Sequence, residues 1–194
     1  MELIKKENFV KYNQIYAPII SKLFVEDACF FSLFLNKTIK WGFVSNKDLQ
    51  ITASCSKSDD TISINLDAVV ESDKTDHLMT IEYYLLHEIR HIYQHIKIRE
   101  LDAGVLKKED KERVKRWKSE TNNYYRAVDN GGTYHLEEYF QQDIEIDAYA
   151  FSYAVMKYKY GNVDFLYIPE RNTDEFWRQV GLWSLEIIKN EPYK

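Results

Sequence analysis

The chain has 194 residues, about the length of one domain, and a chain of that size can bury a core without disulfides or metals to staple it. Hydrophobic residues make up 45% and charged residues 29%, which is ordinary for a globular protein, and the formal net charge of -5 argues against a nucleic-acid partner. No stretch approaches the 18 or so apolar residues that a membrane helix needs, and the first residues lack the apolar core of a secretory signal. We therefore expect a cytoplasmic protein with no membrane partner.

Residue types that punctuate or cross-link a chain are scarce. There are 6 glycines and 3 prolines, and no internal repeat or low-complexity linker that would separate domains. The two cysteines, Cys29 and Cys55, are too few for a disulfide framework or a four-cysteine zinc site, so a reducing compartment is the simpler interpretation. The sequence predicts a single domain over residues 1–194.

The first third of the chain combines one helix with a small sheet. Residues 8–35 are expected to be helical, with the apolar run 28–35 packed inside. Three β-like runs follow at 38–44, 49–55 and 61–66, and turn residues separate them at 46–48 and 56–60. This spacing predicts a meander, and therefore a small, mostly antiparallel sheet.

A helical period takes over at about residue 76 and continues to about 98. Its apolar stripe has three- and four-residue spacing and consists of Leu78, Ile81, Leu85, Ile89, Ile92 and Ile96. A charged helix is expected at 107–118, a loop at 129–132, and further helices at 136–158 and 174–189. The inner stripe of the helix at 136–158 consists of Phe140, Ile144, Ala148, Phe151, Val155 and Tyr158. The inner stripe of the helix at 174–189 consists of Trp177, Val180, Trp183 and Ile187. The fold class is therefore α+β, a small sheet with helices packed around it.

The sequence His87-Glu88-Ile89-Arg90-His91 is an H-E-x-x-H motif within the helix expected at 76–98. Residues four apart lie one turn apart on the same helix face, so the two imidazoles can bind one zinc ion. Glu88 is then carried beside the metal, where it can take a proton from a zinc-bound water. His87 and His91 lie away from the aliphatic stripe, which predicts that they face a cleft while the stripe packs inward. Arg90 is expected to be a surface or ion-pair residue.

A catalytic zinc usually has a third protein ligand. His95 lies one turn further along, but three residues on a straight helix cannot surround one ion, so it is expected beside the site or on the surface. Among the later acids, helical spacing alone does not choose between Glu145 and Asp147. The small residues Ala148 and Ser152 share a face with Glu145 and favour it, because they allow a close approach of two helices. Asp147 would then be a buried acid that orients a histidine.

These motifs together resemble a known family. His87-Glu88-x-x-His91, followed by EIDAYAFS at residues 145–152, resembles the gluzincin-type ImmA/IrrE metallopeptidases, which pair an H-E-x-x-H helix with a helix of the form E-x-[DE]-A-x-x-F-A. The run 62–66 is similar to the edge strand before the active-site helix of such enzymes. The resemblance implies a zincin-like fold, with His87, His91 and Glu145 as zinc ligands and Glu88 as general base. His91 and Glu145 are 54 residues apart, longer than in compact members, which predicts an insertion at about 99–135.

The expected activity is zinc-dependent hydrolysis of a peptide bond in a protein or peptide substrate, with Ni, Co or Fe able to replace Zn²⁺ after purification. In relatives of this kind the substrate is often a transcriptional repressor. The strand at 61–66 is expected to bind extended substrate by β-augmentation. Candidates for stabilising the oxyanion are Tyr124, Tyr125, Tyr134 and His135. Two alternatives stay open: a zinc-binding interaction protein without proteolysis, and a metal-free helical interaction module. The sequence does not determine the oligomeric state.

Overall fold

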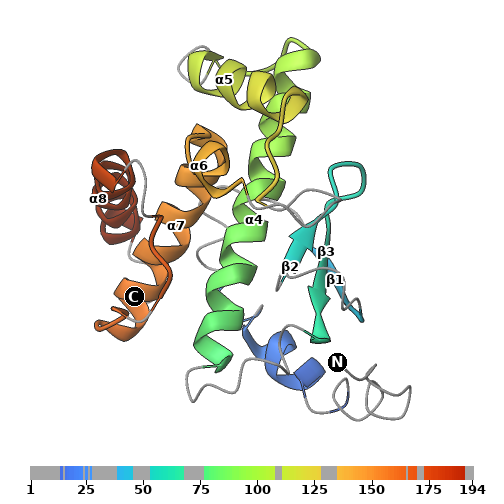
Figure 1. The fold of residues 1–194 in the computed structure, drawn as a ribbon, viewed down its shortest axis with the longest axis vertical. Coiled ribbons are helices and arrows are strands. Elements are labelled where there is room, and N and C mark those ends of the chain that lie inside the picture. The colour runs from blue at the N-terminus through green and yellow to red at the C-terminus, as the bar shows by residue number, and fades with distance from the viewer. Residues whose placement is uncertain are drawn as a thin grey trace. The chain divides into compact units, whose positions relative to one another are not determined.

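The computed structural model has an α+β fold, with a small sheet and a larger set of helices (Figure 1). It describes residues 14, 16–23, 25, 27, 39–45, 53–67, 77–107, 111–127, 135–164, 166–169 and 173–190. The chain divides into two compact units between Ile89 and Arg90. The expected single domain at 1–194, with an insertion at about 99–135, stays a prediction, and each unit is described by itself.

The first unit contains a three-stranded sheet. Its strands are β1 (Lys40–Val44), β2 (Ala53–Cys55) and β3 (Thr61–Asn65), in the order β1-β3-β2. β3 pairs antiparallel with β2 and parallel with β1. The expected meander is therefore wrong, because β1 does not pair with its neighbour in sequence. The short turn at 56–60 forces β2 and β3 to be antiparallel, whereas β1 joins the other side of β3 through a longer connection.

The central position of β3 corrects a second expectation. The run 61–66 was expected to be an edge strand that binds extended substrate, but β3 is hydrogen-bonded to β1 on one side and to β2 on the other. Its backbone groups are used by those two ladders, so it cannot add a substrate strand. Ile62 and Ile64 are fully buried and Thr61 and Ser63 only partly, as alternation along a strand requires.

The helix expected at 8–35 is described only in part. The described residues 14, 16–23 and 25 are all helical, and Ile20 is fully buried among them. The apolar run 28–35, which includes Cys29, lies outside the described residues. The other cysteine, Cys55, is partly buried and forms no disulfide with the described residues.

The long helix α4 (His77–Asp102) confirms the helical period expected at 76–98 and extends it by one turn. Its stripe is buried from Ile81 to Ile92, but Leu78 is 41% exposed. The opposite side is buried too, so polar side chains such as Glu82, Arg90 and Gln94 are enclosed with the apolar ones. Buried polar groups need partners, and those of Arg90 and Gln94 lie on other helices. α4 is continuous through the division between the units.

The second unit contains α5 (Lys111–Asn122), α6 (Leu136–Tyr139), α7 (Asp143–Tyr160) and α8 (Thr173–Asn190) up to Lys189, together with α4 from Arg90. α5 packs against α7. Its two buried residues, Val114 and Trp117, form a core cluster with Leu106 and Ile144. The charged residues of α5 are mostly exposed, as expected for a solvated helix face.

The helix expected at 136–158 is two helices. α6 ends at Tyr139, and α7 begins after Gln142. The backbone of Gln142 is extended, and its side chain makes no capping hydrogen bond to α7. Glu120 of α5 supplies the missing cap, because its carboxylate accepts the backbone N–H groups of Asp143 and Ile144 at 3.0 and 2.9 Å. Burial raises the pKa of Glu120, and these hydrogen bonds partly oppose that rise. The loop expected at 129–132 lies outside the described residues.

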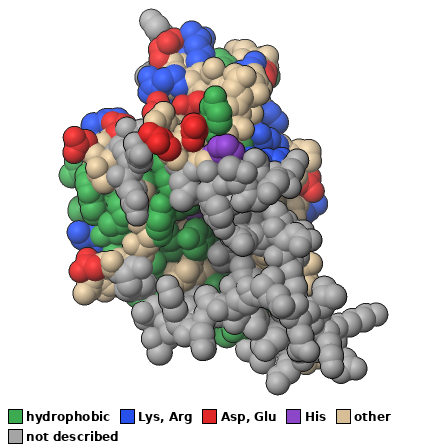
Figure 2. Space-filling model, viewed as in Figure 1, with side chains coloured by type: hydrophobic (Ala, Val, Ile, Leu, Met, Phe, Trp, Pro, Cys, Tyr) green, Lys and Arg blue, Asp and Glu red, His purple; other side chains and the backbone are tan. Residues whose placement is uncertain are grey.

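α8 buries Phe176, Val180 and Ile187. Trp177, expected inward, is 43% exposed, and Phe176 is the ring that is fully buried. Trp177 keeps one edge on Tyr153, with 5.3 Å between ring centroids, which leaves the rest of the indole in solvent. Figure 2 shows hydrophobic side chains gathered over α7 and α8 and charges of both signs over α5. Among the described residues, no helix has the length and apolar character needed to cross a membrane.

Candidate metal centre

Both histidines of the H-E-x-x-H motif lie on α4, one turn apart. His87 and His91 are buried, and their relative position is set by the helix itself, because α4 is continuous from His77 to Asp102. The side of α4 that carries the motif is buried along with the aliphatic stripe, and the expectation that the two histidines face a cleft stays a prediction. Glu88 lies between them on the same helix and is also largely buried.

Glu145 lies in the first turn of α7 and is 0% exposed. Its Oε1 lies 3.3 Å from the Nε2 of His91. One ligand atom from each of His87, His91 and Glu145 lies within 4.8 Å of the others, so these three buried side chains form a group that could hold a metal ion. The helix start also favours the carboxylate, because the dipole of α7 is positive at that end.

One distance within this group has the length expected between two ligands of a tetrahedral metal. Ligands about 2.0–2.1 Å from a tetrahedral centre lie about 3.3–3.4 Å from one another. The separation of 3.3 Å between His91 Nε2 and Glu145 Oε1 has this value before any side chain moves. Two imidazoles and one carboxylate are also a donor set that leaves a fourth position open.

Two tyrosine hydroxyls hold the carboxylate of Glu145. Tyr124 donates to Oε1 at 2.6 Å, and Tyr139 of α6 donates to Oε2 through a very short contact. Burial, followed by the negative charge of Glu145, raises the pKa of the Tyr139 hydroxyl well above its usual value, so it remains a donor. Tyr124 was among the residues expected to stabilise the oxyanion. Tyr139 was not expected at the site, because its position beside Glu145 depends on the break between α6 and α7.

The other nitrogen of His91 is held by Gln94. His91 Nδ1 lies 2.7 Å from Gln94 Oε1, and Gln94 Nε2 donates to the Ile144 carbonyl at 2.9 Å and to Asp147 Oδ2 at 2.8 Å. Asp147 was expected to orient a histidine directly. It instead acts on His91 through Gln94, since its carboxylate lies one hydrogen bond further from the ring. The only signal for Gln94 in the sequence is its position three residues after His91.

Arg90 forms the ion pair that anchors this network. Its Nε and Nη2 donate to the two oxygens of Asp147 at 2.7 and 3.2 Å, and Trp183 Nε1 donates to Asp147 Oδ1 at 3.3 Å. The guanidinium is 0% exposed, so the expected surface position is wrong and the expected ion pair is confirmed. Its Cζ lies 4.3 Å from the ring of Tyr93 and 4.2 Å from that of Trp183, which are cation–π distances.

The remaining candidates lie outside the group of three. His95 is buried one turn beyond His91 and stacks on it, with 6.4 Å between ring centroids and 19° between planes. Tyr125 is 55% exposed, and its backbone, not its hydroxyl, bonds the Gln142 side chain. His135 is half-buried and donates its backbone N–H to Ala127. Tyr134 lies outside the described residues.

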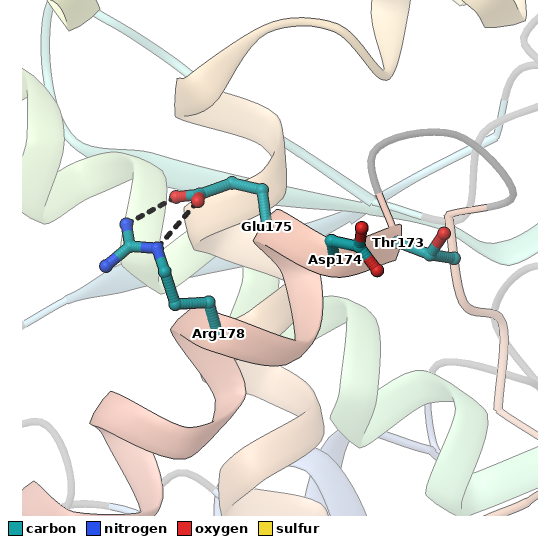
Figure 3. Close-up of a pocket in the computed structure, with 4 residues that line it drawn as sticks. All are labelled: Thr173, Asp174, Glu175 and Arg178. Carbon is teal, nitrogen blue, oxygen red and sulfur yellow. Dashed lines mark hydrogen bonds and ion pairs between the residues drawn. The ribbon is translucent and has the colours of Figure 1, made fainter.

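A shallow depression at the start of α8 is unrelated to this group. It is lined by Thr173, Asp174, Glu175 and Arg178 (Figure 3). Arg178 donates to both carboxylate oxygens of Glu175, and this contact lowers the pKa of Glu175. Glu175 and Arg178 are therefore paired with each other, and none of the three candidate ligands lines the depression.

Comparison with known proteins does not supply a family for this chain. No family model, no curated protein and no solved structure matches it significantly. The group of His87, His91 and Glu145, with the side chains that hold it, is therefore the feature from which a function can be inferred.

Proposed function

We propose that this protein is a zinc-dependent peptidase that uses His87, His91 and Glu145 to hold the metal. The observation that carries the proposal is the meeting of three buried zinc-type ligands from two helices, with 3.3 Å between His91 and Glu145. Zinc is the metal expected for a donor set of two imidazoles and one carboxylate. The fold would then be zincin-like, in keeping with the resemblance of the two motifs to ImmA/IrrE metallopeptidases.

Zinc, when bound, supplies a Lewis acid that lowers the pKa of a water and polarises a carbonyl oxygen. The side chains divide the remaining work. Glu88 accepts the proton of the attacking water on its carboxylate and passes it to the leaving amine. We assign the oxyanion donor to Tyr124, whose single hydroxyl hydrogen is donated to Glu145 Oε1 at 2.6 Å and has to turn from that oxygen to the oxyanion during the reaction. The substrate is a peptide or protein, and a single regulatory protein such as a repressor is the kind of substrate that the resemblance suggests.

The activity is tested by comparing the wild type with Glu88→Gln. This variant keeps the shape of the side chain and all three metal ligands, but its amide cannot accept the proton. Both proteins are incubated with a peptide library and with a mixture of intact proteins, and new N-termini are identified by mass spectrometry. New termini that form with the wild type and not with Glu88→Gln support the proposal. A zinc-loaded wild type that produces the same termini as Glu88→Gln contradicts it.

A second candidate function is a zinc-binding interaction protein without proteolysis. The observation that favours it is the enclosure of the site, because Glu145 is 0% exposed and both of its oxygens accept tyrosine hydroxyls. A metal held in this way would contribute to stability in the manner of a structural zinc. The Glu88→Gln variant distinguishes the two functions. An interaction protein keeps its biological effect in this variant, whereas a peptidase loses it.

A further inference from the structure

Both the oxygen and the nitrogen of the Gln94 side-chain amide make hydrogen bonds, and these bonds join two helices. It is fully buried on α4, and its Nε2 donates both hydrogens to α7, one to the Ile144 carbonyl and one to Asp147 Oδ2. Its Oε1 lies 2.7 Å from His91 Nδ1. The side chain therefore connects a candidate metal ligand on α4 to the first turns of α7, which carry Glu145.

The orientation of this amide is determined by its surroundings. If the group were reversed, its oxygen would face a carbonyl and a carboxylate, which are both acceptors, and two buried acceptors would lose their donor. Oε1 must then face His91. Because an amide oxygen only accepts, His91 Nδ1 must carry a hydrogen.

The tautomer of His91 follows from this orientation. A neutral imidazole with its hydrogen on Nδ1 has a lone pair on Nε2, the atom that lies 3.3 Å from Glu145 Oε1. This lone pair makes Nε2 the ring nitrogen that can bind a metal ion, and it is the nitrogen on the side of Glu145.

The partner that fixes Gln94 is itself held rigidly. Asp147 accepts from Arg90 at 2.7 Å and from Trp183 at 3.3 Å, and the Arg90 guanidinium is enclosed by aromatic rings. Asp147 therefore cannot turn away from Gln94 without leaving a buried charge unpaired.

We propose that Gln94 is a positioning residue that keeps the hydrogen of His91 on Nδ1, and so presents Nε2 to a metal ion. The effect on metal binding rests on the proposed function, but the tautomer does not. Metal-bound histidines commonly donate their second N–H to an acceptor, and loss of that acceptor typically weakens metal binding about 10- to 100-fold. Gln94 differs from a directly bonded carboxylate in that it joins both ligand-bearing helices.

The first experiment reads the tautomer in the metal-free wild type by ¹⁵N NMR of the histidine side chains, at a pH where the ring of His91 is neutral. The expected result is a hydrogen on Nδ1 of His91. A hydrogen on Nε2 would overturn the proposal, whether or not the protein binds zinc. No variant is needed for this measurement, so it does not depend on a substitution that could prevent folding.

The second experiment compares Gln94→Met with Gln94→Glu. Methionine preserves the volume but removes the acceptor, and we expect a mixture of tautomers and about 10- to 100-fold weaker zinc binding in a chelator competition. The Gln94→Glu side chain still presents an oxygen to Nδ1, and in its protonated form it donates its O–H to Asp147 in place of the lost amide N–H, so this form should restore the tautomer. Gln179→Met, the same change at a partly exposed glutamine that bonds only Glu175 in the described network, is the control and should alter neither readout.

The outcomes distinguish the two proposals. A Gln94→Met variant with the wild-type tautomer and zinc affinity would overturn the positioning role. A wild type that binds no zinc after reconstitution would reject the proposed function. In that case the tautomer still decides whether Gln94 positions the ring.

Discussion

His91 Nε2 lies 3.3 Å from Glu145 Oε1, although the two residues are 54 positions apart in the chain. The contact joins α4 to the first turn of α7, and neither residue is on the surface. Ionisable groups are rarely enclosed unless a partner or a metal compensates their charge. The groups that hold these two side chains in place therefore determine how the site responds to substitution.

Removal of the Tyr124 hydroxyl should reduce hydrolysis without releasing the metal. In Tyr124→Phe the oxyanion donor is lost while Tyr139 still holds Glu145, so kcat should fall about 100- to 1000-fold with little change in KM. Zinc content should remain at the wild-type value. Steady-state kinetics on a cleaved peptide gives both constants.

Tyr125→Phe is the matched control, because the Tyr125 ring is mostly exposed and its backbone makes the contacts to Gln142. Its kinetics should equal those of the wild type. Equal kcat values for Tyr124→Phe and Tyr125→Phe would exclude Tyr124 from the reaction.

Removal of the cap on α7 should destabilise the second unit. Glu120→Ala leaves the N–H groups of Asp143 and Ile144 without their acceptor, and the expected loss in the free energy of unfolding is about 0.5–2 kcal/mol. Urea unfolding measures it. Glu112→Ala, on the same helix, removes only an exposed ion pair with Lys115 and should leave the urea midpoint close to that of the wild type. The interpretation of Glu120 as the cap fails if both variants unfold at the same urea concentration.

Breaking the buried ion pair should cost more than any surface change. Arg90→Met leaves the charge of Asp147 enclosed without its main partner, and the expected loss is about 3–5 kcal/mol. Arg178→Met removes an exposed pair with Glu175 and should cost less than about 1 kcal/mol. Denaturant unfolding of the two variants at one pH makes the comparison, and similar losses would mean that Arg90 is not enclosed as described.

Chelation should lower the stability of the wild type. A ligand that binds only the folded state adds stability, about 2.7 kcal/mol when its free concentration is 100 times the dissociation constant. Treatment with a chelator should therefore lower the unfolding midpoint of the wild type and leave that of Glu145→Ala unchanged. Added zinc should restore the wild-type midpoint. A wild-type midpoint that does not respond to chelator or zinc would argue for a metal-free protein.

The sequence predicted the features that depend on local spacing. The helical period located α4, and the four-residue spacing of His87 and His91 placed both on one face of it. The small residues Ala148 and Ser152 indicated a tightly packed helix, and both are fully buried in α7. The sequence also selected Glu145 as the third member of the group, and the structure brings it to the two histidines.

The features that were missed depend on contacts between distant segments. The segment Phe140–Gln142 contains no glycine or proline, so the sequence does not indicate the break between α6 and α7. The break depends on Glu120 of α5, which caps α7. The order of the strands likewise depends on which strands pair. β3 lies at the centre of the described sheet because β1 pairs with one of its edges and β2 with the other. Arg90 and Gln94 look like surface residues in the sequence, since their burial depends on Asp147 and on rings from other helices.

The measurement that tests the central claim most directly is metal content by elemental analysis of protein purified without a metal-affinity tag. We expect one zinc per chain in the wild type and in His95→Ala, whose ring is buried beside the site but outside the group of three. His91→Ala and Glu145→Ala should lose the metal or bind it far more weakly. Zinc lost only in His91→Ala would move the third ligand away from Glu145. No metal in the wild type, even after reconstitution, would contradict the account.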